Sequence, residues 1–304
     1  MGQLEDMTLF IRVVEAEGIS RAAAQLGIAK SAVSRRLMDL ETRLGVRLLN
    51  RTTRTSSLTE AGQEYYERAL RIVDDVTELN AMTVDESTAL EGTINLAAPL
   101  SFGLSHLTPA IDSFIREHPG IRMNIDFSDR HVDLVEEGLD LAFRIARLKD
   151  SSLVARRICP IRIVLSASPA YLEEHGRPES PADLKHHRLL HYTMTGARSW
   201  KLLDQAGNMS TVKISGDIQA NNGEFLKDMA VAGHGIVASP TFICWKAIAT
   251  GDLVPVLCDY RLPEPAAYAV YPGNRYLSRR VRALVDYLVK RFGENPYWDQ
   301  NITP

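Results

Sequence analysis

Two helix-forming segments joined by a tight turn constrain the N-terminal fold of this chain more than any other feature. The first segment, residues 20–27, begins with Ser20, contains three consecutive alanines and ends at Gly27. Serine is a favoured N-cap residue, alanine is the strongest helix former, and glycine commonly ends a helix. Small alanine side chains also allow a second helix to approach closely. The turn 28–30 leads into that second helix, which we expect over residues 31–45.

This second helix has two chemically different faces. One face is an apolar stripe at the spacing 4-3-4, made of Val33, Leu37, Leu40 and Leu44. The opposite face, near the start of the helix, carries hydrogen-bonding side chains: Ser31, Ser34, Arg35 and Arg36. A recognition helix docks one face on its own domain and presents its N-terminal end to base edges, where arginine makes paired contacts to guanine. The pattern therefore predicts a DNA-reading helix, although a plain helical hairpin would share parts of it.

A basic turn between two short β-type runs follows, over residues 46–59. We interpret this segment as a two-stranded wing, with Arg51, Thr52 and Arg54 close to the sugar–phosphate backbone or the minor groove. Arg43 and Arg47 fit either a DNA contact or a solvated surface.

The distribution of charge supports a boundary near residue 58. The chain has a net charge of only −3. Residues 30–58 nevertheless hold seven Lys or Arg against two Asp or Glu, whereas residues 59–91 hold two basic and nine acidic residues. A basic block is the electrostatic footprint expected of a phosphate-binding surface.

The segment from Phe10 to Gly62, which includes SRAAAQLGIAKSAVSRRLMDLETRLGVRLLNRTTRTSSLTEAG, resembles the winged helix-turn-helix of the LysR-type transcriptional regulators. The resemblance implies a DNA-binding domain over residues 1–58. Ser31, Ser34, Arg35 and Arg36 would then belong to the recognition helix. Arg51, Thr52 and Arg54 would belong to the wing.

A long helix is expected next, within a linker and hinge over residues 59–91. Its apolar residues recur at the spacing 4-3-4-3, as Tyr65, Ala69, Ile72, Val76 and Leu79. This is a heptad seam, which needs a packing partner. The seam packs either on the domains of its own chain or antiparallel to a second chain. The resemblance implies a dimer formed through this helix, and a tetramer, on pseudo-palindromic double-stranded DNA.

Strands alternate with helices in the remaining two-thirds of the chain. Strands expected at 93–98, 121–127 and 139–145 form a βαβαβ pattern, which predicts an open, largely parallel α/β sheet. A second block occupies residues 162–266, and a last helix over 278–292 is long enough to return to the first block. INLAAPLSFG and NNGEFLKDMAVAGHGIVASP resemble the effector domain of the same regulators, itself similar to periplasmic binding proteins.

The complete expected fold is an all-α winged helix-turn-helix domain, a long linker helix and an α/β effector-binding domain of two subdomains. The effector domain spans residues 92–304. Its first subdomain comprises residues 92–161 and 267–304, and its second comprises residues 162–266.

Two α/β halves that the chain crosses twice make a hinged cleft, in which ligands bind beyond the carboxyl ends of the strands. The residues expected to line this cleft are Ser101, Phe102, Ser128, Arg144 and Asn222. Arg144 suits a carboxylate, because a guanidinium binds one bidentately. Two alternatives stay open. Ser101 could only cap a helix, and Arg144 could form an internal salt bridge while Arg147 takes its place.

These features favour a sequence-specific transcription regulator that responds to a small-molecule effector. The competing hypothesis is an enzyme or solute-binding module fused to a helix-turn-helix. An enzyme needs an acid–base pair or a nucleophile, and the chain lacks a G-x-S-x-G elbow and a P-loop. We expect no catalytic residues, no cofactor and no metal. With no apolar run of transmembrane length, we also expect no membrane partner and a cytoplasmic location.

Overall fold

A left-handed glycine ends each helix of the helix-turn-helix. Gly27, with φ of 65°, follows α2 (Ile19–Leu26), and Gly45, with φ of 71°, follows α3 (Lys30–Leu44). Glycine adopts this conformation without the steric cost that a Cβ atom imposes. Both ends are where the sequence predicts them. The predicted N-cap of α2 was wrong by two residues, because Gly18 and not Ser20 is the N-cap.

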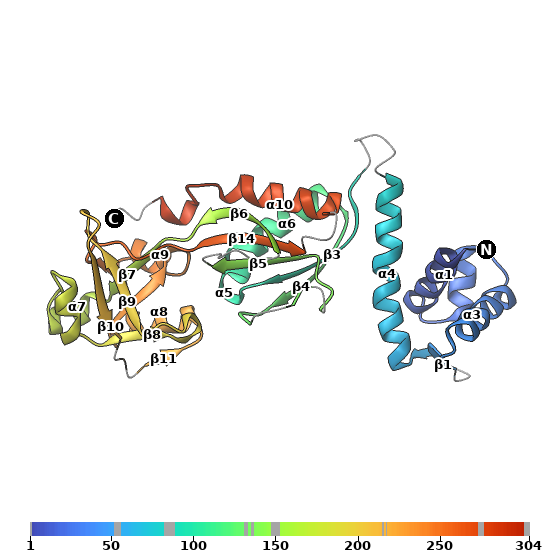
Figure 1. The fold of residues 1–304 in the computed structure, drawn as a ribbon, viewed down its shortest axis with the longest axis horizontal. Helices are drawn as coiled ribbons and strands as arrows, with labels where there is room; N and C mark the ends of the chain where they lie inside the picture. Colours follow the sequence, from blue (N-terminus) through green and yellow to red (C-terminus); the bar gives the residue numbers. More distant parts are fainter. Residues whose placement is uncertain are drawn as a thin grey trace. The chain divides into compact units, whose positions relative to one another are not determined.

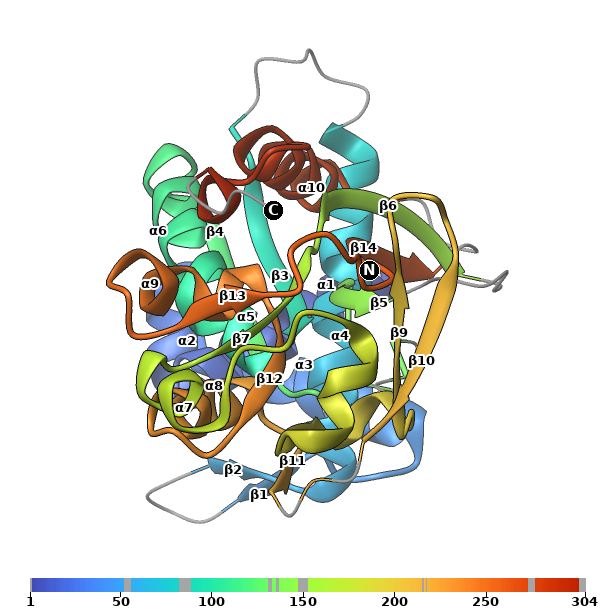
Figure 2. The ribbon, with the colours of Figure 1, turned by 90° about the vertical axis from the view of Figure 1, so that its left-hand side faces the viewer.

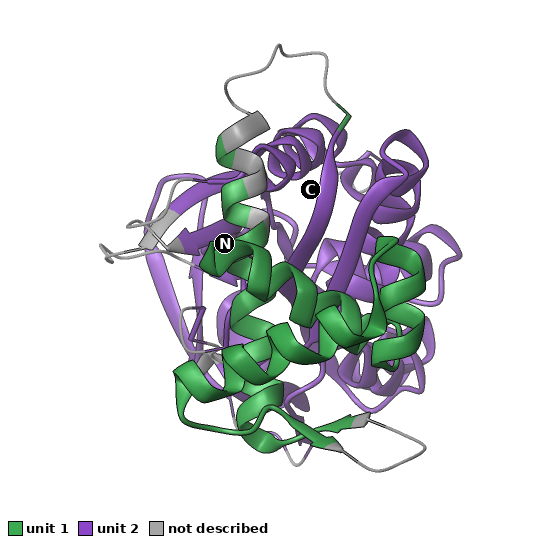
Figure 3. Cartoon of the chain, turned by 90° about the vertical axis from the view of Figure 1, so that its right-hand side faces the viewer, with its two compact units in different colours: residues 1–89 green, residues 90–304 purple. Residues whose placement is uncertain are grey.

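The computed structural model describes residues 2–51, 56–81, 89–130, 133–134, 137–146, 153–214, 216, 218–272 and 277–300. The chain divides into two compact units, residues 1–89 and residues 90–304 (Figure 3). None of the helices in these described ranges is long and apolar enough to cross a lipid bilayer.

The first unit is helical apart from one β-hairpin. Its elements are α1 (Gln3–Glu15), α2, α3, β1 (Leu49–Arg51), β2 (Ser56–Leu58) and α4 (Glu60–Ala81). Strands β1 and β2 pair antiparallel, with Leu49 opposite Leu58. Ala22 and Ala23 of α2 are buried in the same core as Phe10 of α1 and Val33 of α3. The small alanines thus allow the three helices to pack closely, as the sequence indicates.

Helix α4 uses only part of its apolar surface within the chain. Ala69 is buried against Met7 and Ile11 of α1, which supports the interpretation that the helix packs on its own domain. Farther along, Ile72 and Leu79 are 44% and 62% exposed. The start of the heptad seam is therefore covered by α1, while part of its later half remains open to solvent.

The second unit contains two subdomains, each built on a five-stranded sheet (Figures 1 and 2). The elements of the first subdomain are β3 (Glu91–Ala98), α5 (Leu100–Phe102), the π-helix η1 (Gly103–Leu107), α6 (Thr108–Glu117), β4 (Gly120–Phe127), β5 (Leu141–Ala146), β6 (Leu153–Pro160), β14 (Ala266–Pro272), α10 (Arg279–Phe292) and the 3₁₀-helix η4 (Tyr297–Asp299). The elements of the second subdomain are β7 (Ile163–Ala167), α7 (Pro169–His175), η2 (Pro181–His186), β8 (Leu189–Tyr192), η3 (Thr193–Thr195), β9 (Ser199–Leu203), β10 (Met209–Lys213), β11 (Gln219–Ala220), α8 (Gly223–Val231), β12 (Ile236–Pro240), α9 (Thr241–Ala249) and β13 (Val254–Val256).

The first sheet has the strand order β4-β3-β5-β14-β6. Strand β3 pairs parallel to β4 and β5, as the βαβαβ pattern predicts. Strand β14 pairs antiparallel to β5 and β6, so the sheet is mixed. Successive side chains of β3 point to opposite faces of this sheet, and each face has its own hydrophobic core. Ile94 and Leu96 join the large core with α6 and α10, and Ala97 joins a smaller core on the other side.

The second sheet has the strand order β11-β8-β12-β7-β13, with β8 parallel to β11 and β12. The chain passes between the two subdomains at two neighbouring places. There, the Ile161 N–H donates a hydrogen bond of 3.0 Å to the Pro265 carbonyl. Two adjacent crossings are the arrangement expected of a hinged, two-lobed domain.

A buried histidine joins three separate parts of the second unit. The His106 ring of η1 contacts the Tyr297 hydroxyl through Nδ1 at 2.6 Å and the Phe242 carbonyl through Nε2 at 2.9 Å. The carbonyl only accepts, so Nε2 carries the proton and Nδ1 accepts from the tyrosine. Burial is the main reason that the pKa of His106 falls from 6.5 to about 4.

This buried histidine predicts a loss of stability in mild acid. The unfolded chain binds a proton at His106 below about pH 6.5, whereas the folded chain does so only near pH 4. The free energy of unfolding therefore falls as the pH drops through this window, by about 2 kcal/mol between pH 7 and pH 5. Urea unfolding followed by tryptophan fluorescence measures the free energy of unfolding of the second unit, because Trp200, Trp245 and Trp298 all lie there.

The control is His106→Gln, which removes the titrating ring while other acidic groups still titrate. The wild-type protein should lose about 2 kcal/mol more than this variant over the same pH range. Equal losses in the two proteins would show that His106 does not hold a lowered pKa.

Candidate DNA-binding and effector-binding sites

Burial of one stripe of α3 determines which of its side chains face outward. Val33, Leu37 and Leu40 are buried in the core of the first unit. Leu44, the fourth predicted member of the stripe, is 37% exposed in the last turn. Ser31 and Arg35 lie about 160° or more around the helix from Val33, at 100° per residue, and both are exposed. Neither has a polar side-chain partner among the described residues.

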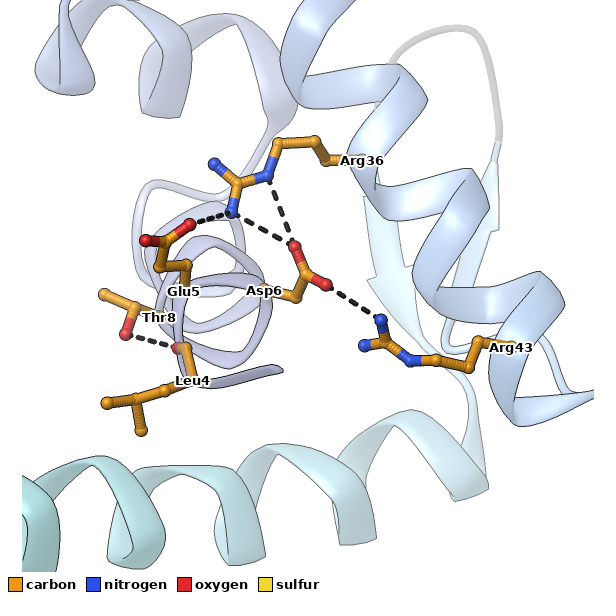
Figure 4. A network of polar contacts seen from close by, with 6 residues as sticks. All are labelled: Leu4, Glu5, Asp6, Thr8, Arg36 and Arg43. Atoms are coloured by element: carbon orange, nitrogen blue, oxygen red, sulfur yellow. Dashed lines mark hydrogen bonds and ion pairs between the residues drawn. The ribbon is translucent and has the colours of Figure 1, made fainter. Parts of the chain in front are cut away.

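Arg36 points elsewhere, which corrects the expectation that it faces DNA (Figure 4). Its Nε and Nη2 donate to Oδ1 of Asp6 in α1, at 3.3 and 3.1 Å. Arg43, two turns later, donates from Nη1 to Oδ2 of the same carboxylate at 3.0 Å. The physical reason is helical geometry, because Arg36 lies three residues after buried Val33 and therefore beside the stripe that docks on α1. Sequence reasoning missed Asp6, whose arginine partners are 30 and 37 residues away.

The remaining predicted DNA-binding residues differ in how far the structure describes them. Ser34 is half-buried on the flank of α3. Arg51 is the last residue of β1, in the hairpin that forms the wing. Thr52 and Arg54 lie outside the described residues.

Two of the predicted effector-binding residues meet at one edge of the first sheet. Ser101 follows β3, Ser128 follows β4, and the two strands end side by side, with Ala98 opposite Phe127. The Ser128 N–H donates to the Ala98 carbonyl at 2.9 Å, and its hydroxyl accepts from the Arg130 N–H at 3.2 Å. Ser101 is half-buried within α5 and does not cap it, since Pro99 is the N-cap.

Phe102 does not line an accessible cleft, in contrast to the sequence-based expectation. It is fully buried, stacks on Phe143 with ring centroids 4.6 Å apart and meets Phe242 and Trp298 edge-on. Its neighbour Ser101 is partly exposed and Phe102 is not, because successive residues of a helical turn point about 100° apart. Phe102 is therefore a core residue that holds α5 in place.

Arg144 and Asn222 are both partly engaged within the chain. Arg144 is half-buried in β5, opposite Tyr268 of β14, and takes part in a side-chain interaction of its own chain. Asn222 is the N-cap of α8, where Oδ1 accepts from the Phe225 N–H at 2.9 Å. Its side-chain NH₂ group has no hydrogen-bond partner among the described residues, and it is the part that can still donate to a ligand.

Tyr192 is a residue of this region that the sequence did not single out. Burial and, second, the negative charge of Asp129 raise its pKa. Asp129 directly follows Ser128 in the first subdomain, whereas Tyr192 ends β8 in the second. Strand β11, which leads to Asn222, pairs with β8 so that Ala220 lies opposite Tyr192. Asp129 of the first subdomain is therefore close enough to Tyr192 of the second for its charge to act on the tyrosine, and Asn222 follows the strand that pairs with β8.

A hollow of about 590 Å³ lies elsewhere in the second unit. Residues of β7 and β13, the segment 257–264 and the C-terminal segment 295–300 line it, including the ion pair of Arg162 with Asp299. None of the five predicted effector-binding residues lines this hollow.

Comparisons with known proteins agree with both units. The family model "LysR substrate binding domain" matches residues 87–293, and "Bacterial regulatory helix-turn-helix protein, lysR family" matches residues 4–63. The HTH-type transcriptional regulator CrgA of Neisseria meningitidis serogroup B is 37% identical over 293 residues, which cover 96% of this chain and 97% of CrgA.

Solved structures give the same result. The structure of CrgA from Neisseria meningitidis is 37% identical, with a TM-score of 0.61, and the match covers 95% of this chain and 99% of that one. The full-length Vibrio cholerae virulence activator AphB is 27% identical, with a TM-score of 0.59 and coverage of 95% and 99%. These relatives are regulators and not enzymes. The chain therefore belongs to the LysR family of transcriptional regulators, with a helix-turn-helix domain followed by a substrate-binding domain.

Proposed function

We propose that the exposed face of α3 reads DNA through Ser31, Ser34 and Arg35, and that the wing residues Arg51, Thr52 and Arg54 contact the sugar–phosphate backbone. The observation that carries this proposal is the exposure of Ser31 and Arg35 on the face of α3 that is turned away from its core. The N-cap residue of α3 is Ala29, which has no side-chain cap, so the first N–H groups of the helix can bind a phosphate.

We further propose that two chains pair through α4 and bind a pseudo-palindromic site, and that two such dimers form a tetramer in the cytoplasm. The exposed Ile72 and Leu79 supply the apolar contact, because each would gain from burial against a second copy of the helix. A two-fold pair presents two α3 helices to two half-sites of DNA, which mirrors a palindromic sequence.

The effector proposed here is a small carboxylate held between the two subdomains. Ser101 and Ser128 supply hydroxyls at the strand ends of the first sheet, and the Asn222 NH₂ group lies on the facing subdomain. Arg144 supplies the cation that pairs with the carboxylate once it exchanges its partner within the chain. Binding would shift the population of one closure of the two subdomains, and the dimer would transmit that change to DNA.

The DNA contact predicts a selective defect for Arg35→Gln. Loss of one paired base contact costs about 1–3 kcal/mol, so affinity for a site selected in vitro should fall by roughly 10- to 100-fold. Fluorescence anisotropy with the selected duplex and with a random duplex measures the two affinities and the ratio between them. Arg12→Gln is the matched control, because Arg12 is an exposed arginine of α1 paired with Glu15. Equal effects of the two substitutions would contradict a reading role for Arg35.

The dimer contact predicts dissociation for Leu79→Gln. Each copy loses roughly 1–2 kcal/mol of apolar burial, so the Kd of the dimer should rise by roughly 100-fold. Sedimentation velocity over a concentration series measures this. The control is Glu67→Gln, because exposed Glu67 lies about 120° around α4 from Leu79, and this change should leave assembly unchanged. If Leu79→Gln dimerises with the same Kd as the wild-type protein, Leu79 does not belong to the dimer interface.

The effector proposal predicts thermal stabilisation by a small carboxylate that depends on Arg144. At about 100 times its Kd, a ligand adds about 2.7 kcal/mol, which raises Tm by several degrees. Arg144→Gln should abolish this rise in a carboxylate screen. Arg122→Gln, which removes an exposed arginine from the same sheet, should retain it. An intact response in Arg144→Gln would exclude Arg144 as the anion site.

A further inference from the structure

We propose that Asp6 limits the sequence-independent DNA affinity of this protein, and its dependence on salt, by withholding Arg36 and Arg43 of the recognition helix from the DNA phosphates. This inference rests on the DNA contacts proposed above for α3. It assigns a role to an acidic residue of α1 that need not touch DNA. It also divides the arginines of α3 into one that is free to bind DNA and two that are held.

The contacts show that both carboxylate oxygens are occupied (Figure 4). Oδ1 accepts from Nε and Nη2 of Arg36, and Oδ2 accepts from Nη1 of Arg43 at 3.0 Å. Glu5 adds a weaker ion pair to Arg36 at 3.8 Å. One carboxylate therefore binds two guanidinium groups at once, and charge-assisted bonds of this kind are the stronger ones.

The arginines reach Asp6 because they occupy the same flank of α3. Seven residues are almost two turns of helix, so Arg36 and Arg43 point in nearly the same direction about 10 Å apart along the axis. Their flank lies beside the buried stripe, which brings it against α1. Arg35 is rotated about 100° away from Arg36 and is exposed. Two arginines at neighbouring positions of α3 therefore differ, because Arg36 is bonded to Asp6 and Arg35 is exposed to solvent.

Burial of the Asp6 carboxylate strengthens its retention of the two guanidinium groups. The Asp6 side chain is only 12% exposed, whereas those of Arg36 and Arg43 are 23% and 47% exposed. A mostly buried carboxylate is stabilised by keeping its cations, while the arginines have enough solvent access to swing outward on their long side chains. Without the Asp6 charge, Arg36 keeps, among the described residues, only the 3.8 Å ion pair with exposed Glu5, and both arginines can reach the phosphates of a bound duplex.

The consequence for DNA affinity follows from what phosphate contacts do. Each arginine that neutralises a phosphate strengthens binding to every sequence and steepens its dependence on salt. Phosphate contacts carry no direct sequence information. Two freed arginines on each recognition helix would therefore raise the affinity for random DNA and for the selected site by similar factors. Asp6 keeps this sequence-independent part of the affinity low.

The test compares full-length wild type with Asp6→Asn, which keeps the shape of the side chain but removes its charge and one acceptor. Binding to a random duplex and to a duplex selected in vitro is measured by anisotropy over a series of salt concentrations. For random DNA, the slope of log K against log salt should steepen by about 1–2 for each chain, and affinity should rise roughly tenfold. The affinity for the selected duplex should rise by a similar factor.

The matched control is Glu15→Gln, which removes one negative charge from the other end of α1, where Glu15 pairs with exposed Arg12. It should change neither the slope nor the affinity for random DNA. The triple variant Asp6→Asn, Arg36→Gln, Arg43→Gln should return the slope to the wild-type value, because the freed arginines are then absent. A purely structural role of Asp6 would not produce that reversal.

Two results would overturn the proposal. One is an unchanged or shallower slope in folded Asp6→Asn. The other is a shallower slope in Arg36→Gln or Arg43→Gln alone, which would show that these arginines already contact DNA. The second measurement leaves Asp6 in place, so it decides the question even when Asp6→Asn does not fold. Failure of the proposed DNA contacts of α3 would give a different result from failure of the Asp6 proposal, because the wild-type protein would then show no salt-dependent DNA binding.

Discussion

The burial of one stripe of α3 against α1 and α2 is the constraint on which the DNA-binding surface depends. Val33, Leu37 and Leu40 occupy the core, so every other position of the helix is assigned a direction at 100° per residue. Arg35 points outward because of this packing, and Arg36 points toward α1. The alanines of α2 matter for the same reason, since a larger side chain there would separate the helices and change that direction.

Helix α1 is the common platform of the first unit. One side of it carries Asp6, which binds two arginines of α3, and another carries Met7 and Ile11, which pack on Ala69 of α4. Tyr65 of α4 is close enough to the charged cluster that burial, Arg43 and Asp6 all act on its pKa. Helices α3 and α4 therefore both pack on the same short element, so α1 joins the helix proposed to read DNA to the helix proposed to pair two chains.

Aromatic packing plays the corresponding role in the second unit. Phe102 lies between rings contributed by β5, α9 and the C-terminal η4, and His106 hydrogen-bonds two of those segments. This cluster anchors α5 directly behind Ser101. The charge of Asp129, beside Ser128, acts on Tyr192 of the other subdomain, and the two chain crossings between the subdomains lie together beside Ile161.

The sequence by itself determined the helix-turn-helix, its glycine ends, the α/β character of the second unit and the family, because these depend on local spacing and residue type. Only the tertiary structure decided what individual side chains do. Phe102 and Ser101 are neighbours in a chemically suitable segment, yet packing buries one of them. Arg35 and Arg36 are the same residue type, yet Asp6, 30 residues away from Arg36, binds only that one. Contacts between residues far apart in the chain produce no periodic pattern in the sequence, so they cannot be predicted from any single segment.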